Sequence, residues 1–224
     1  MIRPGKLAAL LLLLLMPAPL AAQESCRIPE RLEAQPCERR GETPRGQMQR
    51  GRPGDFDFYV LAFSWSPGFC ASEAGRRSPG QCRDNEFGWV VHGLWPQYAK
   101  GRAETQPWPQ HCAATQPLPP ALMRRHFCAM PDARLMQCQW AKHGSCSGLA
   151  ADAYFAAIDR LAARFAPPVP AADSQPAAAF RAAMLAARPE LQARHLQVIR
   201  RDGRIREIRI CLDKTLAEPL DCRG

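Results

Sequence analysis

The stretch FDFYVLAFSW, residues 56–65, is apolar and strongly aromatic over nearly its whole length. A short run of this kind, rich in aromatic and branched side chains, is typical of a buried β-strand. A second strand is predicted over Phe87–Val91, and it would deliver His92 to a turn that Gly93 and Pro96 favour. The chain therefore enters its first histidine-bearing segment directly from a predicted strand.

Two further strands are predicted near the end of the chain. Gln197–Arg200 and Arg204–Leu212 flank Asp202-Gly203, a dipeptide typical of hairpin turns. In the second of these strands the apolar residues alternate with Arg209 and Cys211, which is the pattern of a half-buried strand.

Four helices are predicted between the two pairs of strands, over Ala121–Phe127, Leu135–His143, Ala151–Phe165 and Pro176–Arg188. The third is alanine-rich and amphipathic, and Asp152 suits its start. In the second, the three- and four-residue spacing places Gln139, Lys142 and His143 on one face. Residues 76–85 and 99–120 are predicted as loops, and neither an internal repeat nor a second domain is predicted.

The start of the chain has the features of a secretory signal peptide. Arg3 and Lys6 precede an apolar run over Leu7–Leu15, and small residues follow up to Ala22. A membrane anchor is the alternative, but the apolar run is too short to span a bilayer comfortably. We therefore expect residues 1–22 to be removed and the mature protein to be soluble, either periplasmic or secreted.

The mature chain suits one domain with a sizeable core. Residues 23–53 are polar and predict an irregular N-terminal arm, in which we expect Cys26 and Cys37 to close a small loop. Residues 54–224 form the predicted domain. The formal net charge of +9 favours a polyanionic partner, although this is weak evidence by itself.

All ten cysteines lie after the predicted signal peptide. An even number of cysteines in an exported chain predicts up to five disulfides. A zinc site is the alternative, since Cys138, His143 and Cys146 are close in sequence, but they lack the usual paired-cysteine spacing. We therefore expect no metal.

Two short segments carry the candidate chemistry. VHGLWP, residues 91–96, contains His92, and WAKHGSC, residues 140–146, contains Lys142 and His143. Two imidazoles that titrate near neutrality can remove and deliver a proton, and a neighbouring cation can stabilise a growing negative charge. These groups suffice to cleave a phosphodiester without a metal. The alternative is two structural histidines and a solvated lysine.

Together the two segments resemble the active-site segments of the ribonuclease T2 family, the secreted acid endoribonucleases, and bacterial periplasmic members above all. The similarity extends in order over residues 54–222. It implies an α+β fold with a central antiparallel β-sheet flanked by helices and stabilised by disulfides. It also implies cleavage of single-stranded RNA by transphosphorylation, through a 2′,3′-cyclic phosphate, with low base specificity and no cofactor.

The resemblance also implies roles for individual residues. His143 would be the general base for the ribose 2′-OH, His92 the general acid for the leaving 5′-oxygen, and Lys142 the cation that stabilises the transition state. Trp95 would line the phosphate and base pocket, with core packing as its alternative. The need for a 2′-OH would exclude DNA as a substrate. We expect a monomer whose partner is RNA and which has no membrane contact after signal removal.

Three disulfides follow from the same resemblance, namely Cys70–Cys82, Cys112–Cys146 and Cys211–Cys222. Cys26–Cys37 and Cys128–Cys138 would be the remaining pairs, although connectivity cannot be deduced from sequence alone.

The chain departs from the family pattern at two positions. The family's second segment usually begins His-Glu-Trp, whereas this chain has Cys138, Gln139 and Trp140. Gln139 cannot raise a neighbouring pKa by charge, but its amide can donate a hydrogen bond to a phosphate oxygen. We therefore expect a working enzyme with a lowered turnover or an altered pH profile.

Two alternative functions remain open at this point. One is a catalytically impaired, exported RNA-binding relative, in which the change at Gln139 abolished the chemistry. The other is an exported disulfide-rich interaction domain, which would leave the two histidine segments without an explanation.

Overall fold

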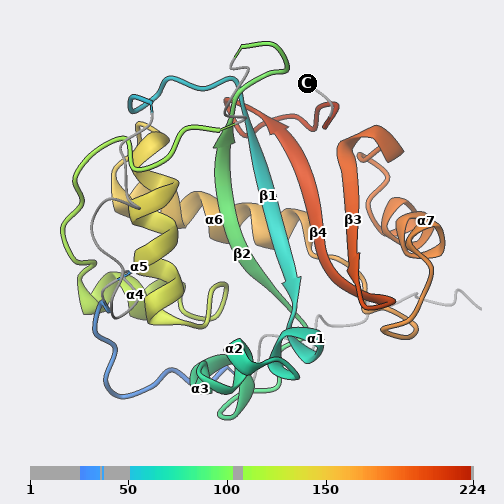
Figure 1. Ribbon diagram of the computed structural model, residues 1–224, viewed down its shortest axis with the longest axis horizontal. Coiled ribbons are helices and arrows are strands. Elements are labelled where there is room, and N and C mark those ends of the chain that lie inside the picture. The colour runs from blue at the N-terminus through green and yellow to red at the C-terminus, as the bar shows by residue number, and fades with distance from the viewer. Residues whose placement is uncertain (1–25, 36, 38–50, 103–107, 223–224) are drawn as a thin grey trace, which may run out of the picture.

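The computed structural model describes residues 26–35, 37, 51–102 and 108–222. Its centre is one antiparallel sheet with the strand order β2-β1-β4-β3 (Figure 1). The strands are β1 Phe58–Trp65, β2 Trp89–Gln97, β3 Leu196–Arg201 and β4 Arg204–Asp213. The predicted α+β class with a central antiparallel sheet is therefore confirmed.

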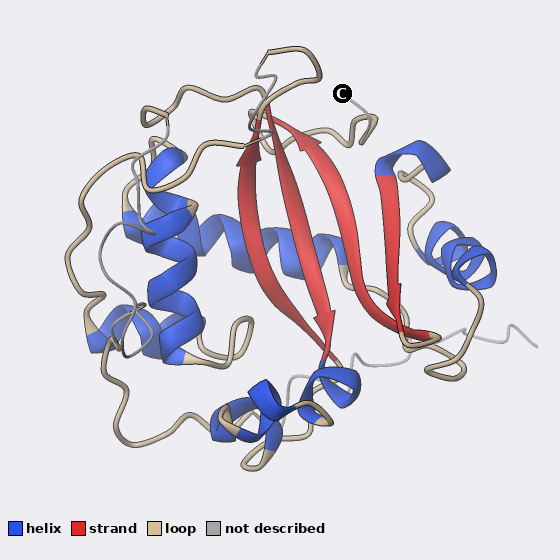
Figure 2. Ribbon diagram, in the orientation of Figure 1, coloured by secondary structure: helices blue, strands red, loops and turns tan. Residues whose placement is uncertain are grey.

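The four long helices lie where the sequence predicts them. They are α4 Pro120–His126, α5 Ala133–Lys142, α6 Ala151–Phe165 and α7 Ala177–Ala187. Figure 2 shows α6 crossing behind the sheet, with α4 and α5 beyond the β2 edge and α7 beside β3. The sheet is thus covered on one face and flanked at both edges.

The prediction of a plain loop over residues 76–85 was wrong. Three short helices follow β1, namely α1 Ser66–Cys70, α2 Glu73–Arg76 and α3 Pro79–Cys82. The side chain of Ser72 caps α2 by accepting from the Gly75 backbone N–H at 3.2 Å, and Pro79 occupies the first turn of α3. Such caps and prolines start helices even where apolar periodicity is too short to detect.

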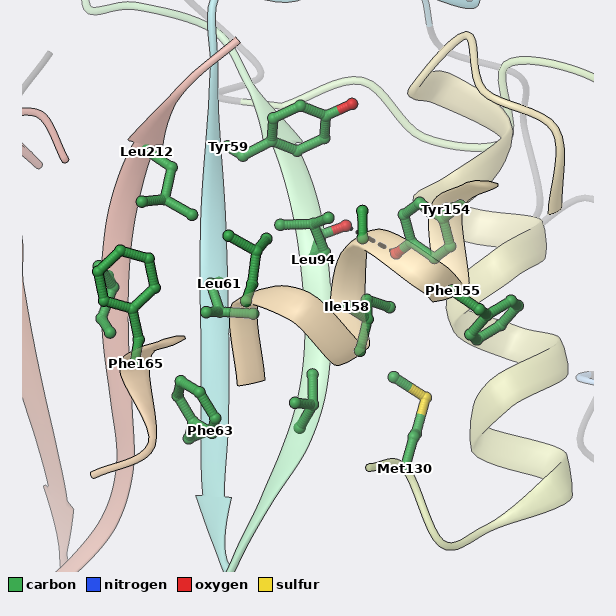
Figure 3. Packing of buried hydrophobic residues seen from close by; sticks show 14 of the residues in the cluster. Tyr59, Leu61, Phe63, Leu94, Met130, Tyr154, Phe155, Ile158, Phe165 and Leu212 are labelled. Atoms are coloured by element: carbon green, nitrogen blue, oxygen red, sulfur yellow. Dashed lines mark hydrogen bonds between the residues drawn. The ribbon is translucent and has the colours of Figure 1, made fainter. Parts of the chain in front are cut away.

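The main core lies between the sheet and α6. Tyr59, Leu61 and Phe63 of β1 point to this side, since alternate residues of a strand face opposite sides. They pack against the apolar face of α6, which includes Phe155 and Ile158 (Figure 3). The buried hydroxyl of α6 residue Tyr154 donates to the carbonyl oxygen of Leu94 at 2.7 Å, which joins α6 to β2 (Figure 3).

The prediction that His92 lies in a turn was wrong, because β2 continues through this residue to Gln97. Ala62 of β1 pairs with Gly93, and Phe63 pairs with Val91, so His92 is the extra residue of a β-bulge. A bulge bends the strand and redirects a side chain. Pro96 is tolerated because β2 is an edge strand, where a missing N–H costs no ladder hydrogen bond.

The hairpin of β3 and β4 is confirmed. Asp202 and Gly203 both have positive φ angles, 51° and 73°, as a two-residue hairpin turn of type I′ requires. The turn therefore allows β3 and β4 to pair directly, and β4 in turn pairs with β1 in the middle of the sheet.

Five disulfides join all ten cysteines. Three of them, Cys70–Cys82, Cys112–Cys146 and Cys211–Cys222, are as the resemblance implies. The other two predicted pairs, Cys26–Cys37 and Cys128–Cys138, were wrong, because the structure pairs Cys26 with Cys128 and Cys37 with Cys138.

The corrected pairs bind the N-terminal arm to the domain. The arm does not close on itself, because it lies against the region of α4 and α5 and buries Leu32 in the core. Its described residues contain no helix or strand, as expected. The zinc alternative loses both thiol ligands, since Cys138 and Cys146 are in disulfides.

The predicted signal peptide, residues 1–22, lies outside the described residues. Within the described ranges, none of the helices has the length and apolar character needed to cross a membrane.

Candidate active site

The bulge of β2 directs His92 towards a carboxylate on β4. Nδ1 of His92 lies 2.7 Å from Oε2 of Glu207, and Oε1 of Glu207 accepts from Nε of Arg209 at 2.6 Å. Burial would by itself raise the pKa of Glu207. The hydrogen bond from His92, together with the positive charges of His92 and Arg209, outweighs it and lowers that pKa below its ordinary value. Glu207 is therefore a buried but ionised partner of His92.

His143 has the opposite environment. It follows the last residue of α5, its backbone N–H donates to the carbonyl of Gln139 at 2.9 Å, and its side chain is buried. Burial, followed by the positive charge of Lys142, lowers the pKa of His143 from 6.5 to about 3. His143 is consequently a neutral imidazole over the acid to neutral pH range, which suits a proton acceptor.

Trp95 lies between the two histidines. Its ring centroid is 5.1 Å from that of His92 and 5.6 Å from that of His143. Its Nε1 donates to Oε1 of Gln139 at 2.7 Å, and the guanidinium carbon of Arg209 lies 5.3 Å from the ring centroid. Trp95 thus contacts side chains from β2, α5 and β4 and packs between the two histidines.

Gly93 is required by this close packing. A Cβ at this position would lie 2.1 Å from Nε1 of Trp95 and 2.3 Å from Oε1 of Gln139. Both distances are far below van der Waals contact, so a larger residue would displace the hydrogen bond between the two side chains.

The structure brings all five sequence-predicted site residues into one region. His92 and Trp95 come from β2, whereas Gln139, Lys142 and His143 come from α5 and its end. The two elements are held by the contact of Trp95 with Gln139, and the disulfide Cys112–Cys146 closes the chain around the end of α5.

The sequence analysis did not identify three charged or titratable residues as part of this site. Glu207 and Arg209 are two of them, and the signal that could have identified them is their place on one face of a predicted strand of isoleucines. His111 is the third. Its backbone N–H donates to the carbonyl of Lys142 at 2.9 Å, and burial, followed by the charge of Lys142, lowers its pKa. No local pattern of the sequence distinguishes it.

The described residues enclose a groove of about 1450 Å³ that reaches His92. Its walls come from α1–α3 and their connections, from the N-terminal arm, from β1 and β2, and from the ends of α4 and α5. Of the five predicted site residues, His92 alone is among the residues that line this groove. A groove of this size has room for an extended ligand beside His92.

Comparisons with known proteins place this chain in a family. The model of the ribonuclease T2 family matches residues 56–174, which include every sequence-predicted catalytic residue. A probable ribonuclease of Haemophilus influenzae is 43% identical over 114 residues, which are 47% of this chain and 42% of that protein. Ribonuclease I of Escherichia coli is 32% identical over 149 residues, covering 51% of this chain and 56% of that protein. The chain thus spans about half the length of the curated relatives it matches.

Solved structures agree on the fold. An RNase-related protein from Calystegia sepium superposes with a TM-score of 0.57 at 22% identity, covering 75% of this chain and 91% of that one. RNase NT in complex with 5′-AMP superposes with a TM-score of 0.55 at 22% identity, covering 76% of this chain and 92% of that one. Because the family model covers more than half of the sequence and the fold agrees, the chain belongs to the ribonuclease T2 family.

Proposed function

We propose that this protein is a metal-independent endoribonuclease that cleaves single-stranded RNA by transphosphorylation. The observation that carries the proposal is the pair of histidines around Trp95. His143 has the positive charge of Lys142 near it, whereas His92 has the negative charge of Glu207 beside it. Burial and Lys142 keep His143 neutral, whereas Nδ1 of His92 lies 2.7 Å from the ionised Glu207. A base and an acid are thereby available in the same pH range, as general acid–base catalysis requires.

In the proposed reaction, His143 takes the proton of the ribose 2′-OH. The 2′-oxygen then attacks the adjacent phosphorus, and His92 delivers a proton to the 5′-oxygen as the P–O5′ bond breaks. The products are a 2′,3′-cyclic phosphate and a free 5′-hydroxyl, and the two histidines exchange protonation states. Lys142, which acts electrostatically on His143, stabilises the additional negative charge of the transition state.

The same mechanism sets the substrate class. Because the nucleophile is the 2′-hydroxyl, DNA is not a substrate. The formal net charge of +9, which becomes +7 without Arg3 and Lys6 of the proposed signal peptide, supports attraction to a polyanion with salt-sensitive binding. Trp95 is proposed to line the pocket for phosphate and base, and the groove beside His92 has room for a single strand. Low base specificity is proposed from the resemblance to the family alone.

The proposal extends to the form and place of the protein. We infer that residues 1–22 are a signal peptide, that residues 23–53 form the arm and that residues 54–224 form the ribonuclease domain. The protein would act as a monomer in the periplasm or outside the cell. The alternative of a non-catalytic RNA-binding relative has no support from the comparisons, and a protein without turnover has no chemical need for His92, Lys142 and His143 together.

The test is incubation of the purified, oxidised mature protein with homopolymer RNA from acid to neutral pH, with excess chelator. His143→Ala is the matched control. We expect 2′,3′-cyclic phosphate ends from the wild-type protein and none from the variant. RNA binding without cyclic phosphate over the whole range would refute turnover and favour the non-catalytic alternative.

A further inference from the structure

We propose that β4 supplies a second part of the active site, in which Glu207 positions His92 and Arg209 binds the scissile phosphate. This inference rests on the proposed ribonuclease function and deepens it. Neither residue lies in the two histidine segments, and both lie beyond residue 174, where the match to the family model ends.

On one face of the sheet, side chains of β2 and β4 can meet above β1. These strands are not neighbours, because β1 lies between them. Opposite Glu207 and Arg209, however, β1 carries the small residues Ser64 and Ala62. Since side chains at paired positions share a face, Ser64 and Ala62 leave room above β1 for the side chains of β2 and β4 to meet.

Glu207 uses its two carboxylate oxygens for two different partners. One lies 2.7 Å from Nδ1 of His92 and the other accepts from Nε of Arg209 at 2.6 Å, while the side chain itself is only 12% exposed. With the Nδ1 proton donated to the carboxylate, the other ring nitrogen, Nε2, carries the proton that can be delivered to a leaving oxygen. The carboxylate therefore determines both the orientation and the tautomer of His92.

Arg209 is held in place by two contacts and still presents free hydrogen-bonding capacity. Its Nε is engaged by Glu207, and its guanidinium lies over the ring of Trp95 at 5.3 Å. A guanidinium has five N–H donors, of which Nε supplies one, and the Arg209 side chain is 36% exposed. A planar guanidinium fixed beside the acid histidine suits two parallel hydrogen bonds to phosphate oxygens.

The first experiment is the pH dependence of kcat/KM for the wild-type protein, Glu207→Gln and the exposed control Glu190→Gln. Glutamine keeps a hydrogen-bond acceptor but loses the charge. We expect kcat to fall roughly 10- to 100-fold in Glu207→Gln, the range seen when a residue that orients a metal-bound histidine is replaced. The shape of the pH profile of kcat/KM should change in Glu207→Gln, because a neutral amide replaces the ionised carboxylate beside His92. Glu190→Gln should match the wild type.

The second experiment measures KM for homopolymer RNA against salt concentration for Arg209→Gln and for Arg160→Gln. Arg160 is exposed on α6, on the other face of the sheet, and provides the same charge change. Loss of one phosphate contact should reduce the slope of log KM against log salt by about 0.7 in Arg209→Gln. Arg160→Gln should leave the slope unchanged.

A third measurement needs no substitution. Nitrogen NMR of the histidines in the wild-type protein should find Nδ1 of His92 protonated even when the imidazole is neutral. An unchanged kcat and pH profile in folded Glu207→Gln, equal salt slopes for the two arginine variants, or a neutral His92 protonated at Nε2 would each overturn the corresponding assignment. If the wild-type protein produced no cyclic phosphate, the proposed ribonuclease function would fail instead, and the NMR result would still report on Glu207.

Discussion

The buried His143 should make the fold sensitive to acid. In the folded protein the pKa of His143 is lowered from 6.5 to about 3, because burial and the charge of Lys142 oppose protonation. The unfolded chain therefore binds a proton at this residue as the pH falls below 6.5, whereas the folded chain does not until about pH 3. Stability from this residue is present above pH 6.5 and is lost progressively between pH 6.5 and about 3.

The size of this effect follows from the two pKa values. Each pH unit within this window changes the free energy of unfolding by about 1.4 kcal/mol for one group. From pH 7.5 to pH 4.5, protonation of His143 in the unfolded chain should lower the free energy of unfolding by about 2–3 kcal/mol. This is a large part of the roughly 5–15 kcal/mol that stabilises a typical domain.

The assay is urea unfolding at pH 7.5 and 4.5, with the disulfides intact and tryptophan fluorescence as the signal. The wild-type protein is compared with His143→Gln, whose side chain does not titrate. All other titrating groups are common to both proteins, so the difference between their pH dependences reports on His143. We expect the wild-type protein to lose about 2–3 kcal/mol more than the variant between the two pH values. Equal losses would refute the reasoning that burial keeps His143 neutral.

Three further substitutions test a charge in the site, the packing at Gly93 and a hydrogen bond in the core. Gln139→Glu should raise kcat/KM, because a carboxylate at this position of α5 restores a negative charge near His143. A kcat/KM that stays the same or falls in the steady-state assay would contradict this role for Gln139. Gly93→Ala should lower kcat/KM at least tenfold, since the new methyl group displaces the hydrogen bond between Trp95 and Gln139, and a steady-state assay with unchanged kcat/KM would count against that contact. Tyr154→Phe should lower the free energy of unfolding by about 1–3 kcal/mol with KM unchanged, because the buried carbonyl of Leu94 loses its donor; urea unfolding at neutral pH checks the first part and steady-state kinetics the second.

The elements of the fold were largely predictable from local sequence. The apolar run over residues 56–65 became β1, and α6 has the predicted bounds Ala151–Phe165. Asp202-Gly203 forms the predicted hairpin turn. In each case the deciding interactions lie within a few residues along the chain, namely strand alternation, helical periodicity and the positive φ angles of a tight turn.

Two of the errors arose where contacts between residues distant in the sequence decide the structure. Gly93 and Pro96 suggested a turn after His92, but pairing with β1 keeps this segment extended and absorbs one residue as a bulge. Cys26 and Cys37 are neighbours in sequence, yet the arm lies against α4 and α5, so each cysteine meets a partner about a hundred residues away.

The same distinction between local sequence and distant contacts applies to the candidate site. The sequence by itself determined the chemical groups, because His92, Trp95, Lys142 and His143 occur in two recognisable segments. Only the tertiary structure decided their states, since it buries His143 and places Glu207, 115 residues away in the chain, beside His92. A pKa depends on burial and on nearby charges, and both are properties of the folded arrangement in space that no single segment of the chain contains.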